Sequence, residues 1–327
     1  MSGRLAGFVG RRVLQALPTI LLIAIINFLI LHAAPGDIVD ILAGEAGSAT
    51  PEYLADLRSR FGLDQPLPVQ LGRFLLRTLT LDLGYSFRHT MPVATLIFDR
   101  LPATLLLMCV SLVSAIAIGV VLGVVAARRV NRPTDGLISF LTLLCYATPT
   151  FWIGLMMIVL FSVKLSWLPT GGMITLAGNL TGFARALDIA RHAILPATVL
   201  SLFYVAVYTR LMRASFLQVS GADFIRTARA KGLPERQVTW RHVFRNALLP
   251  TVTVAGLQVG SILGGAVLVE TVFGWPGLGR LAYEAVFQRD FNLLLGILLI
   301  SSILVIVVNI AMDLLYAKLD PRIDLAS

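Results

Sequence analysis

The sequence predicts an all-α integral membrane protein with six transmembrane helices. Of its 327 residues, 57% are apolar and 14% are charged, whereas soluble globular domains average roughly 45–50% apolar and about 25% charged residues. The mean hydropathy is +0.83, so too few polar side chains are present to cover a water-soluble body of this size. The chain also contains six long runs without Asp, Glu, Lys or Arg.

Each of these charge-free runs is a predicted span. A helix needs roughly 20 mostly apolar residues to cross about 30 Å of hydrocarbon, and a charge at its centre costs about 2.5–3.5 kcal/mol on insertion scales. The shortest run, Ile194–Thr209, needs an extra helical turn from a flanking segment to span the membrane. The first run, Val13–Leu31, is longer than the apolar core of a cleaved signal peptide. We expect the first run to be a retained helix. The runs are Val13–Leu31, Leu101–Ala127, Gly136–Val163, Ile194–Thr209, Ala247–Val269 and Phe291–Met312.

The distribution of Lys and Arg predicts that both termini are cytoplasmic. With the N-terminus inside, the inner segments hold 16 of the 27 basic residues and 6 of the 18 acidic ones, and the outer segments hold the rest. Cytoplasmic loops are enriched in Lys and Arg, so this topology accounts for the net charge of +9 without a nucleic-acid partner. We expect the basic face to attract anionic membrane lipids. The inner segments are 1–12, 128–135, 210–246 and 313–327.

The spans and their connections divide the chain into four parts. Residues 1–32 form an N-terminal transmembrane helix, and residues 33–92 form an extracytoplasmic helical segment. Residues 93–317 form a core of five helices that includes a long cytoplasmic loop at 210–246, and residues 318–327 form a cytoplasmic tail.

The extracytoplasmic segment predicts two short helices. Thr50 can cap a helix that begins at Pro51 and stops at Gly62. A second helix covers Val69–Leu79. The segment could contact a soluble partner or simply cover the ends of the spans, and the sequence favours neither role over the other.

The cytoplasmic loop 210–246 is the most informative stretch. Ser220 followed by Asp223 is a weak capping-box variant at a helix start. Gly232 supplies a left-handed cap, and Pro234 opens the next helix. The result is a basic helix–glycine–helix elbow. It suits docking of another protein, and the alternative is an amphipathic elbow that lies on anionic lipid.

Glycines in two spans predict close helix packing. Gly256, Gly260 and Gly264 recur every four residues and are expected on one helix face. We expect them at a helix-packing or subunit interface. Gly119 and Gly123 form a single pair, for which packing within the chain is the expectation.

Motifs that carry catalysis or metal binding are scarce. No Gly-Lys dipeptide occurs, which excludes a P-loop. The four histidines have no metal-ligand spacing, and Cys109 and Cys145 lie in apolar runs. The runs also lack the ionisable residues of ion-coupled secondary transporters and the constellation of a membrane-embedded enzyme. We expect no catalytic residue, metal or cofactor in this chain.

Several motifs in a fixed order resemble one family. Asp223–Leu233 and Arg241–Pro250 resemble the EAA loop of ABC-importer permeases, and more narrowly that of the first permease subunit of bacterial dipeptide, oligopeptide and nickel importers. At the Glu-Ala-Ala positions of the general pattern this chain has Arg226, Thr227 and Ala228. Further segments that match the subfamily are Arg11–Pro18, Ala34–Asp37, Phe61–Gln70, Leu81–Ser86, Glu270–Gly279 and Asp313–Arg322.

The resemblance implies the type-1 ABC importer permease fold and a division of labour in the cell inner membrane. Two cytoplasmic ABC ATPases use ATP and Mg²⁺, a second homologous permease completes the pathway, and an external solute-binding protein delivers the solute. The chain itself is then not an enzyme. Peptides are the expected solute, and similar systems carry chelated nickel, glutathione or oligosaccharides.

The resemblance also assigns residues. A coupling helix that seats on an ATPase maps to Ala222, Asp223, Arg226, Thr227, Ala228, Lys231, Gly232, Leu233 and Arg236. Candidates for the translocation path are Gln258, Ser261, Asn309, Phe273 and Trp275. For the first three an interhelical hydrogen bond is the more common role of such a residue, and the last two fit an ordinary tight turn equally well.

Overall fold

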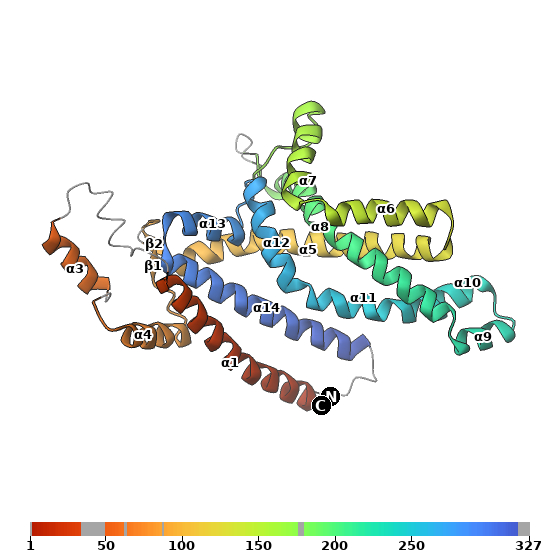
Figure 1. Ribbon diagram of the computed structural model, residues 1–327, viewed down its shortest axis with the longest axis horizontal. Helices are drawn as coiled ribbons and strands as arrows, with labels where there is room; N and C mark the ends of the chain where they lie inside the picture. Colours follow the sequence, from red (N-terminus) through yellow and green to blue (C-terminus); the bar gives the residue numbers. More distant parts are fainter. Residues whose placement is uncertain (1, 34–49, 62–63, 87, 176–179, 320–327) are drawn as a thin grey trace. The chain divides into compact units, whose positions relative to one another are not determined.

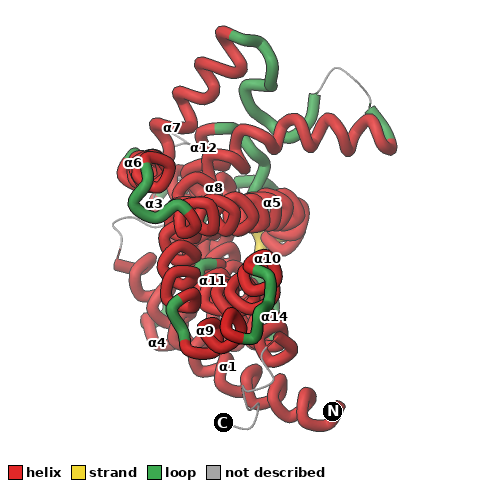
Figure 2. The backbone as a smooth tube through the Cα atoms, turned by 90° about the vertical axis from the view of Figure 1, so that its right-hand side faces the viewer, coloured by secondary structure: helices red, strands yellow, loops and turns green. Residues whose placement is uncertain are grey.

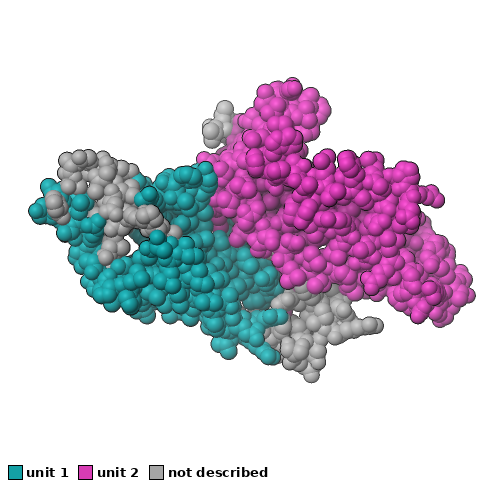
Figure 3. All heavy atoms as spheres, viewed as in Figure 1, with its two compact units in different colours: residues 1–101, 281–311, 321–327 teal, residues 102–280, 312–320 magenta. Residues whose placement is uncertain are grey.

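A computed structural model describes residues 2–33, 50–61, 64–86, 88–175 and 180–319, and these are almost entirely helical (Figures 1 and 2). The predicted stop at Gly62, the motif Ala34–Asp37 and most of the predicted tail lie outside the described residues. Two compact units divide the chain, and Figure 3 colours them separately. The predicted division into four parts stays a prediction.

The first unit combines residues 1–101, 281–311 and 321–327. Its short strands pair antiparallel, with Ser86 opposite Met91. Its elements are α1 (Ser2–Ala33), α3 (Pro51–Phe61), α4 (Leu67–Leu79), β1 (Tyr85–Ser86), β2 (Met91–Pro92), the start of α5 (Val93–Arg128), most of α13 (Leu278–Gln288) and most of α14 (Phe291–Leu319).

Both predicted external helices are present in this unit. The Tyr53 amide donates to the Thr50 hydroxyl at 3.3 Å, so the predicted cap of α3 is confirmed. Helix α4 begins two residues before the predicted start and packs on α1, where the Phe28 and Phe74 rings stack with centroids 5.5 Å apart.

A buried polar pair fixes the start of α14 in the same unit. The Ser86 hydroxyl donates to the Asp290 carboxylate, and both residues are buried. The other carboxylate oxygen of Asp290 accepts the Leu293 amide at 3.1 Å, which is the geometry of a helix N-cap. The hairpin and α14 are thereby fastened to each other.

The second unit combines residues 102–280 and 312–320. Its central helix is α8, which packs against α6, α7, α11 and α12. Its further elements are α6 (Pro133–Ala147), α7 (Thr150–Met157), the π-helix η1 (Ile158–Lys164), α8 (Gly182–Ser220), α9 (Asp223–Ala230), α10 (Glu235–Gln237), the π-helix η2 (Val238–Phe244), α11 (Arg245–Leu257) and α12 (Val259–Val272).

The glycine pair of α5 lies at its contact with α8, as predicted. A Cβ added at Gly119 would lie 2.6 Å from the Tyr208 Cβ. One added at Gly123 would lie 2.7 Å from the Met212 Cβ and 2.8 Å from the Thr209 carbonyl oxygen. The two backbones approach so closely that only glycine fits.

Four described helices are long and apolar enough to cross a membrane, and two bent helix pairs bring the number to six if each pair is one span. The third predicted span, Gly136–Val163, coincides with one of these bent pairs. Helices α6 and α7 differ in direction by 102°. Pro149 follows the break and lacks an amide hydrogen, and Thr148 before it is extended, with φ −84° and ψ 133°.

The fifth predicted span is also bent. Helices α11 and α12 meet at Gln258 with an angle of 61°. The expectation that Gly256, Gly260 and Gly264 share one helix face is therefore wrong, because Gly256 lies in α11 before the bend and the other two lie in α12 after it. No atom lies within 4 Å of a Cβ added at Gly264. Their place at a subunit interface stays a prediction.

Candidate coupling elbow and translocation path

The elbow starts at the end of α8. The predicted capping box is wrong, because the Ser220 hydroxyl donates to the Phe216 carbonyl at 2.7 Å and thus belongs to the last turn of α8. Helix α9 begins at Asp223, after an extended Ala222 with φ −70° and ψ 150°, and has no side-chain cap. Asp223 still lies in the first turn, where a carboxylate favours the helix dipole.

Gly232 ends α9 in the predicted left-handed conformation, with φ +77°. Its amide donates to the Arg229 carbonyl at 2.9 Å, and the Leu233 amide donates to the Ala228 carbonyl at 3.4 Å. This pair of hydrogen bonds defines a Schellman motif. Nothing lies within 4 Å of a Cβ added at Gly232, so the backbone conformation alone requires glycine.

An ion pair closes the bend on its solvent side. Two nitrogens of the Arg229 guanidinium donate to the Glu235 carboxylate at 3.1 and 2.8 Å. These hydrogen bonds raise the pKa of Arg229. Both side chains are largely exposed, so the ion pair contributes little to the free energy of folding. Its main effect is to orient α9 and α10 relative to each other. The sequence analysis did not identify this pair, because the six-residue spacing becomes a contact only once the chain turns at Gly232.

One face of the elbow is buried in the second unit. Ile225 of α9 is fully buried and Ala228 is 7% exposed. They share one hydrophobic cluster with side chains of α5, α8, η2 and α11, which are Val120, Val124, Ala127, Met212, Phe216, Val238, Val243 and Ala247. The partly buried Ala222 and Leu233 pack against the same cluster. The elbow is therefore fastened to three long helices.

The opposite face of the elbow is exposed. It presents most of the predicted coupling residues, which are Asp223, Arg226, Thr227, Lys231, Gly232 and Arg236. It also presents Phe224, which is 49% exposed and was not predicted. An aromatic ring beside polar groups on an exposed short helix is typical of a protein contact surface. Phe224 directly precedes buried Ile225, and the packing of α9 is needed to show that Phe224 lies outside the buried side of this helix.

Two candidates for the translocation path are buried instead. Phe273 is 2% exposed, and Trp275 is fully buried with its indole N–H donating to the Ala103 carbonyl at 2.9 Å. The Gly172 amide donates to the Phe273 carbonyl at 2.8 Å. The prediction that these side chains line a path is wrong, because both are core residues of the turn between α12 and α13.

The sequence analysis missed Glu270, which is fully buried at the end of α12. Its carboxylate accepts the Thr104 hydroxyl at 2.7 Å, the Arg280 amide at 3.0 Å and the Gly279 amide. The Thr104 hydroxyl oxygen in turn accepts the Leu278 amide at 2.7 Å. The first three amides of α13 are thus satisfied by a carboxylate and a hydroxyl, which suits the positive end of a helix.

Two glycines make room for this carboxylate. A Cβ added at Gly277 would overlap the Glu270 carboxylate, and one added at Gly279 would lie 2.9 Å from the carboxylate oxygen. The signal in the sequence is the acid directly after an apolar run and before three glycines in Gly274–Gly279. Its partner Thr104 lies 166 residues away, so the contact itself was beyond local reasoning.

The remaining path candidates are polar positions with partial or full exposure. Gln258 forms the bend between α11 and α12 and is partly buried, and Ser261 is exposed in the next turn. Asn309 is exposed on α14, in the first unit. Their role stays a prediction.

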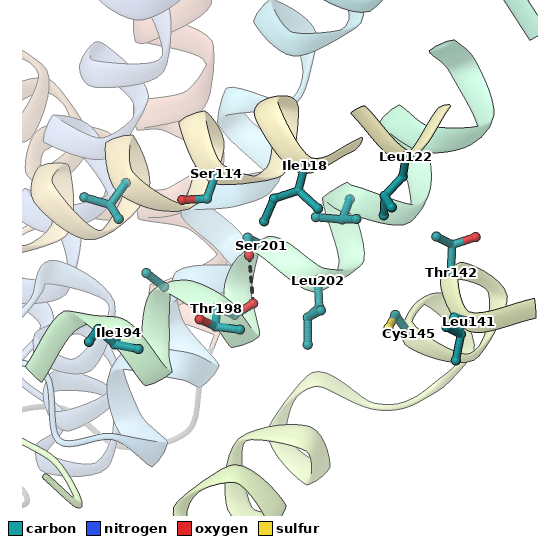
Figure 4. A pocket seen from close by; sticks show the side chains of 13 residues that line it. Ser114, Ile118, Leu122, Leu141, Thr142, Cys145, Ile194, Thr198, Ser201 and Leu202 are labelled. Carbon is teal, nitrogen blue, oxygen red and sulfur yellow. Dashed lines mark hydrogen bonds between the residues drawn. The ribbon is translucent and has the colours of Figure 1, made fainter. Parts of the chain in front are cut away.

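A pocket of about 380 Å³ lies between α5, α6 and α8 (Figure 4). The Thr142 hydroxyl donates to the Ile138 carbonyl at 2.8 Å and the Ser201 hydroxyl to the Thr198 carbonyl at 2.8 Å. Apolar side chains such as Ile118 form most of its wall. None of the predicted path residues lines this pocket, and a peptide would leave its own polar groups unpaired there.

Comparison with known proteins identifies the family. A family model described as the inner membrane component of binding-protein-dependent transport systems matches residues 119–325, and the model of its N-terminal part matches residues 5–108. The oligopeptide transport system permease protein AppB of Bacillus subtilis is 42% identical over 98% of this chain and 100% of its own length. The dipeptide transport system permease protein DppB of Escherichia coli is 40% identical over 97% and 98%.

Solved structures show the same fold. A chain of the inward-facing MetNI methionine ABC transporter superposes with a TM-score of 0.55 at 18% identity, over 69% of this chain and 97% of that one. The predicted fold of type-1 ABC importer permeases is therefore confirmed. The chain belongs to the inner membrane components of binding-protein-dependent transport systems, and it is a multi-pass protein of the inner membrane.

Proposed function

We propose that this chain forms one half of the translocation pathway of an ATP-driven peptide importer. The elbow carries the proposal, because it offers an exposed helix to a partner while its other face is packed among α5, α8 and α11. The relatives named as oligopeptide and dipeptide permeases match nearly end to end. That match supports peptides over chelated nickel, glutathione or oligosaccharides, and an importer subunit over a self-sufficient secondary transporter.

Three kinds of partner complete the proposed machine. Both termini and the elbow face the cytoplasm, where two ABC ATPases bind ATP and Mg²⁺. A second homologous permease subunit completes the pathway, and an external solute-binding protein delivers the peptide near α3, α4 and α13. This chain holds no cofactor and catalyses no reaction. The positive-inside distribution of Lys and Arg supports this orientation.

The packing of α9 gives the proposal its physical mechanism. When the ATPases close around ATP, they displace the exposed face of α9. Ile225 and Ala228 cannot move alone, because protein interiors are densely packed and have few voids. Movement of α9 is therefore passed to α8 and α11, and these helices change the side from which the pathway is open.

Replacing Gly232 by valine is expected to lower peptide uptake about tenfold or more, because a left-handed conformation costs a β-branched residue about 1–3 kcal/mol and redirects the second arm. The core should stay intact, since a Cβ at this position meets no atom. Uptake and ATPase stimulation are measured with the complex in proteoliposomes, and membrane insertion is measured by fractionation. Gly232→Asn is the control, because asparagine tolerates this conformation. Wild-type uptake by the valine variant would refute the coupling role.

A further inference from the structure

We propose that the segment from α10 through η2 into α11 binds the headgroup of an anionic phospholipid. The proposal rests on the cytoplasmic orientation of the elbow in the proposed function. A surface hollow of about 450 Å³ opens here, lined by Pro234, Arg236, Gln237, Trp240 and Arg241. This wall contains two guanidinium groups, one amide and one indole, so it offers several hydrogen-bond donors to a single ligand.

Both guanidinium groups of the hollow are available to an external anion. Within the described part of the chain, neither Arg236 nor Arg241 has an ion-pair partner, and the nearest carboxylate along the chain, Glu235, is engaged by Arg229. Arginine binds phosphate with two parallel hydrogen bonds and holds its charge at any physiological pH. The hollow therefore fits a phosphate-bearing anion.

An exposed aromatic ring lies next to the basic side chains of the hollow. Arg236 and Trp240 lie four residues apart and are both exposed, whereas Phe244 and Leu248 further along are partly buried and pack against the hydrophobic cluster that holds α9. Trp240 is 49% exposed, and its ring lies 5.2 Å from that of Phe244 between centroids. This arrangement matches a phospholipid with its phosphate at the arginines and its glycerol region at the indole.

The position of the hollow favours a lipid over the ATPase. Residues Glu235–Leu257 are the first half of a bent candidate span, and the charge-free run of this span begins at Ala247, six residues after Arg241. The hollow therefore lies on the cytoplasmic side of the apolar segment. Tryptophan and arginine at such a boundary are typical interfacial anchors. The exposed face of α9 precedes the Gly232 bend and remains the ATPase surface. Arg236, which the family resemblance places at the end of the coupling helix, belongs to the lipid site in this proposal.

The test uses the full-length chain in nanodiscs of phosphatidylcholine that contain brominated phosphatidylglycerol or, at equal mole fraction, brominated phosphatidylcholine. Trp152→Phe and Trp167→Phe remove two other exposed indoles, and buried Trp275 remains as a constant background. Quenching of Trp240 fluorescence reports the lipid beside it. We expect about a tenfold local preference for the anionic lipid, since both arginines attract it.

Two double variants that remove the same number of positive charges distinguish a specific lipid site from general attraction of anionic lipid to a basic surface. Arg236→Gln with Arg241→Gln should abolish the preference, whereas Arg128→Gln with Arg129→Gln should preserve it. Equal quenching by both lipids, or a preference that survives the first pair of substitutions, would overturn the proposal. Protection of Trp240 by added ATPase with no quenching by either lipid would also overturn it. Because uptake is not measured, the result is independent of the coupling test at Gly232.

Discussion

Replacing Gly123 by leucine is expected to eliminate folded protein from the membrane. Overpacking a close-packed core typically costs about 1–3 kcal/mol and sometimes more. Here the new Cβ would meet the Met212 Cβ at 2.7 Å and the backbone oxygen of Thr209 at 2.8 Å. A backbone atom cannot turn aside as a flexible side chain can, so α5 and α8 would have to separate. That separation would also open the cluster that holds α9.

Size-exclusion chromatography of the detergent-solubilised protein measures this effect, with the eluting protein detected by the fluorescence of a fused fluorescent protein. We expect Gly123→Leu to elute as aggregate or to be degraded. Gly136→Leu is the matched control, because Gly136 also lies in a helix and no atom is within 4 Å of its added Cβ. A monodisperse peak of wild-type size for the Gly123 variant would contradict the close contact of α5 and α8.

Replacing Glu270 by alanine is expected to destabilise the turn between α12 and α13 strongly. The change leaves the Thr104 hydroxyl and the amides of Gly279 and Arg280 without their acceptor. Hydrogen bonds to a charged group contribute about 1.5–3 kcal/mol each, and removal of the carboxylate also removes the desolvation cost of burying it. The free energy of unfolding should therefore fall by about 3 kcal/mol, less than the sum of the three bonds. The melting temperature in detergent should then drop by about 5 °C or more.

Two further variants make the Glu270 experiment specific. Glu270→Gln keeps the shape and one acceptor oxygen, and it should lose less stability than the alanine variant. Glu52→Ala removes an exposed carboxylate from α3 and should leave the melting temperature unchanged. Wild-type melting of Glu270→Ala would contradict the role of this carboxylate as the cap of α13.

Local signals in the sequence predicted local structure well. The cap at Thr50, the left-handed Gly232 and the small-residue contact at Gly119 and Gly123 each depend on a few neighbouring residues, and all three are confirmed. The absence of charge located the spans correctly, because the cost of a charge in hydrocarbon depends only on its presence. The absence of charge carries no information about the direction of the helix axis, so it did not reveal the bend between α6 and α7 next to Pro149.

Contacts between distant residues account for most of what the sequence analysis missed. Phe273 and Trp275 were assigned to a path because they lie in a Gly- and Pro-rich turn, but contacts with Gly172 and Ala103 bury them. Glu270 was overlooked because its partner Thr104 lies in another helix. For the coupling residues, the motifs in the sequence predicted the position of the elbow and the family resemblance implied its role. The packing of Ile225 became visible only in the structure.

Transport by reconstituted protein tests the central claim most directly. Proteoliposomes are prepared with this chain, its permease partner and the binding protein, either with or without the two ATPases, and labelled peptide is followed against its gradient. The account predicts accumulation only with ATPases and ATP, and its loss in the Gly232→Val complex. Accumulation against the gradient without any ATPase would contradict it.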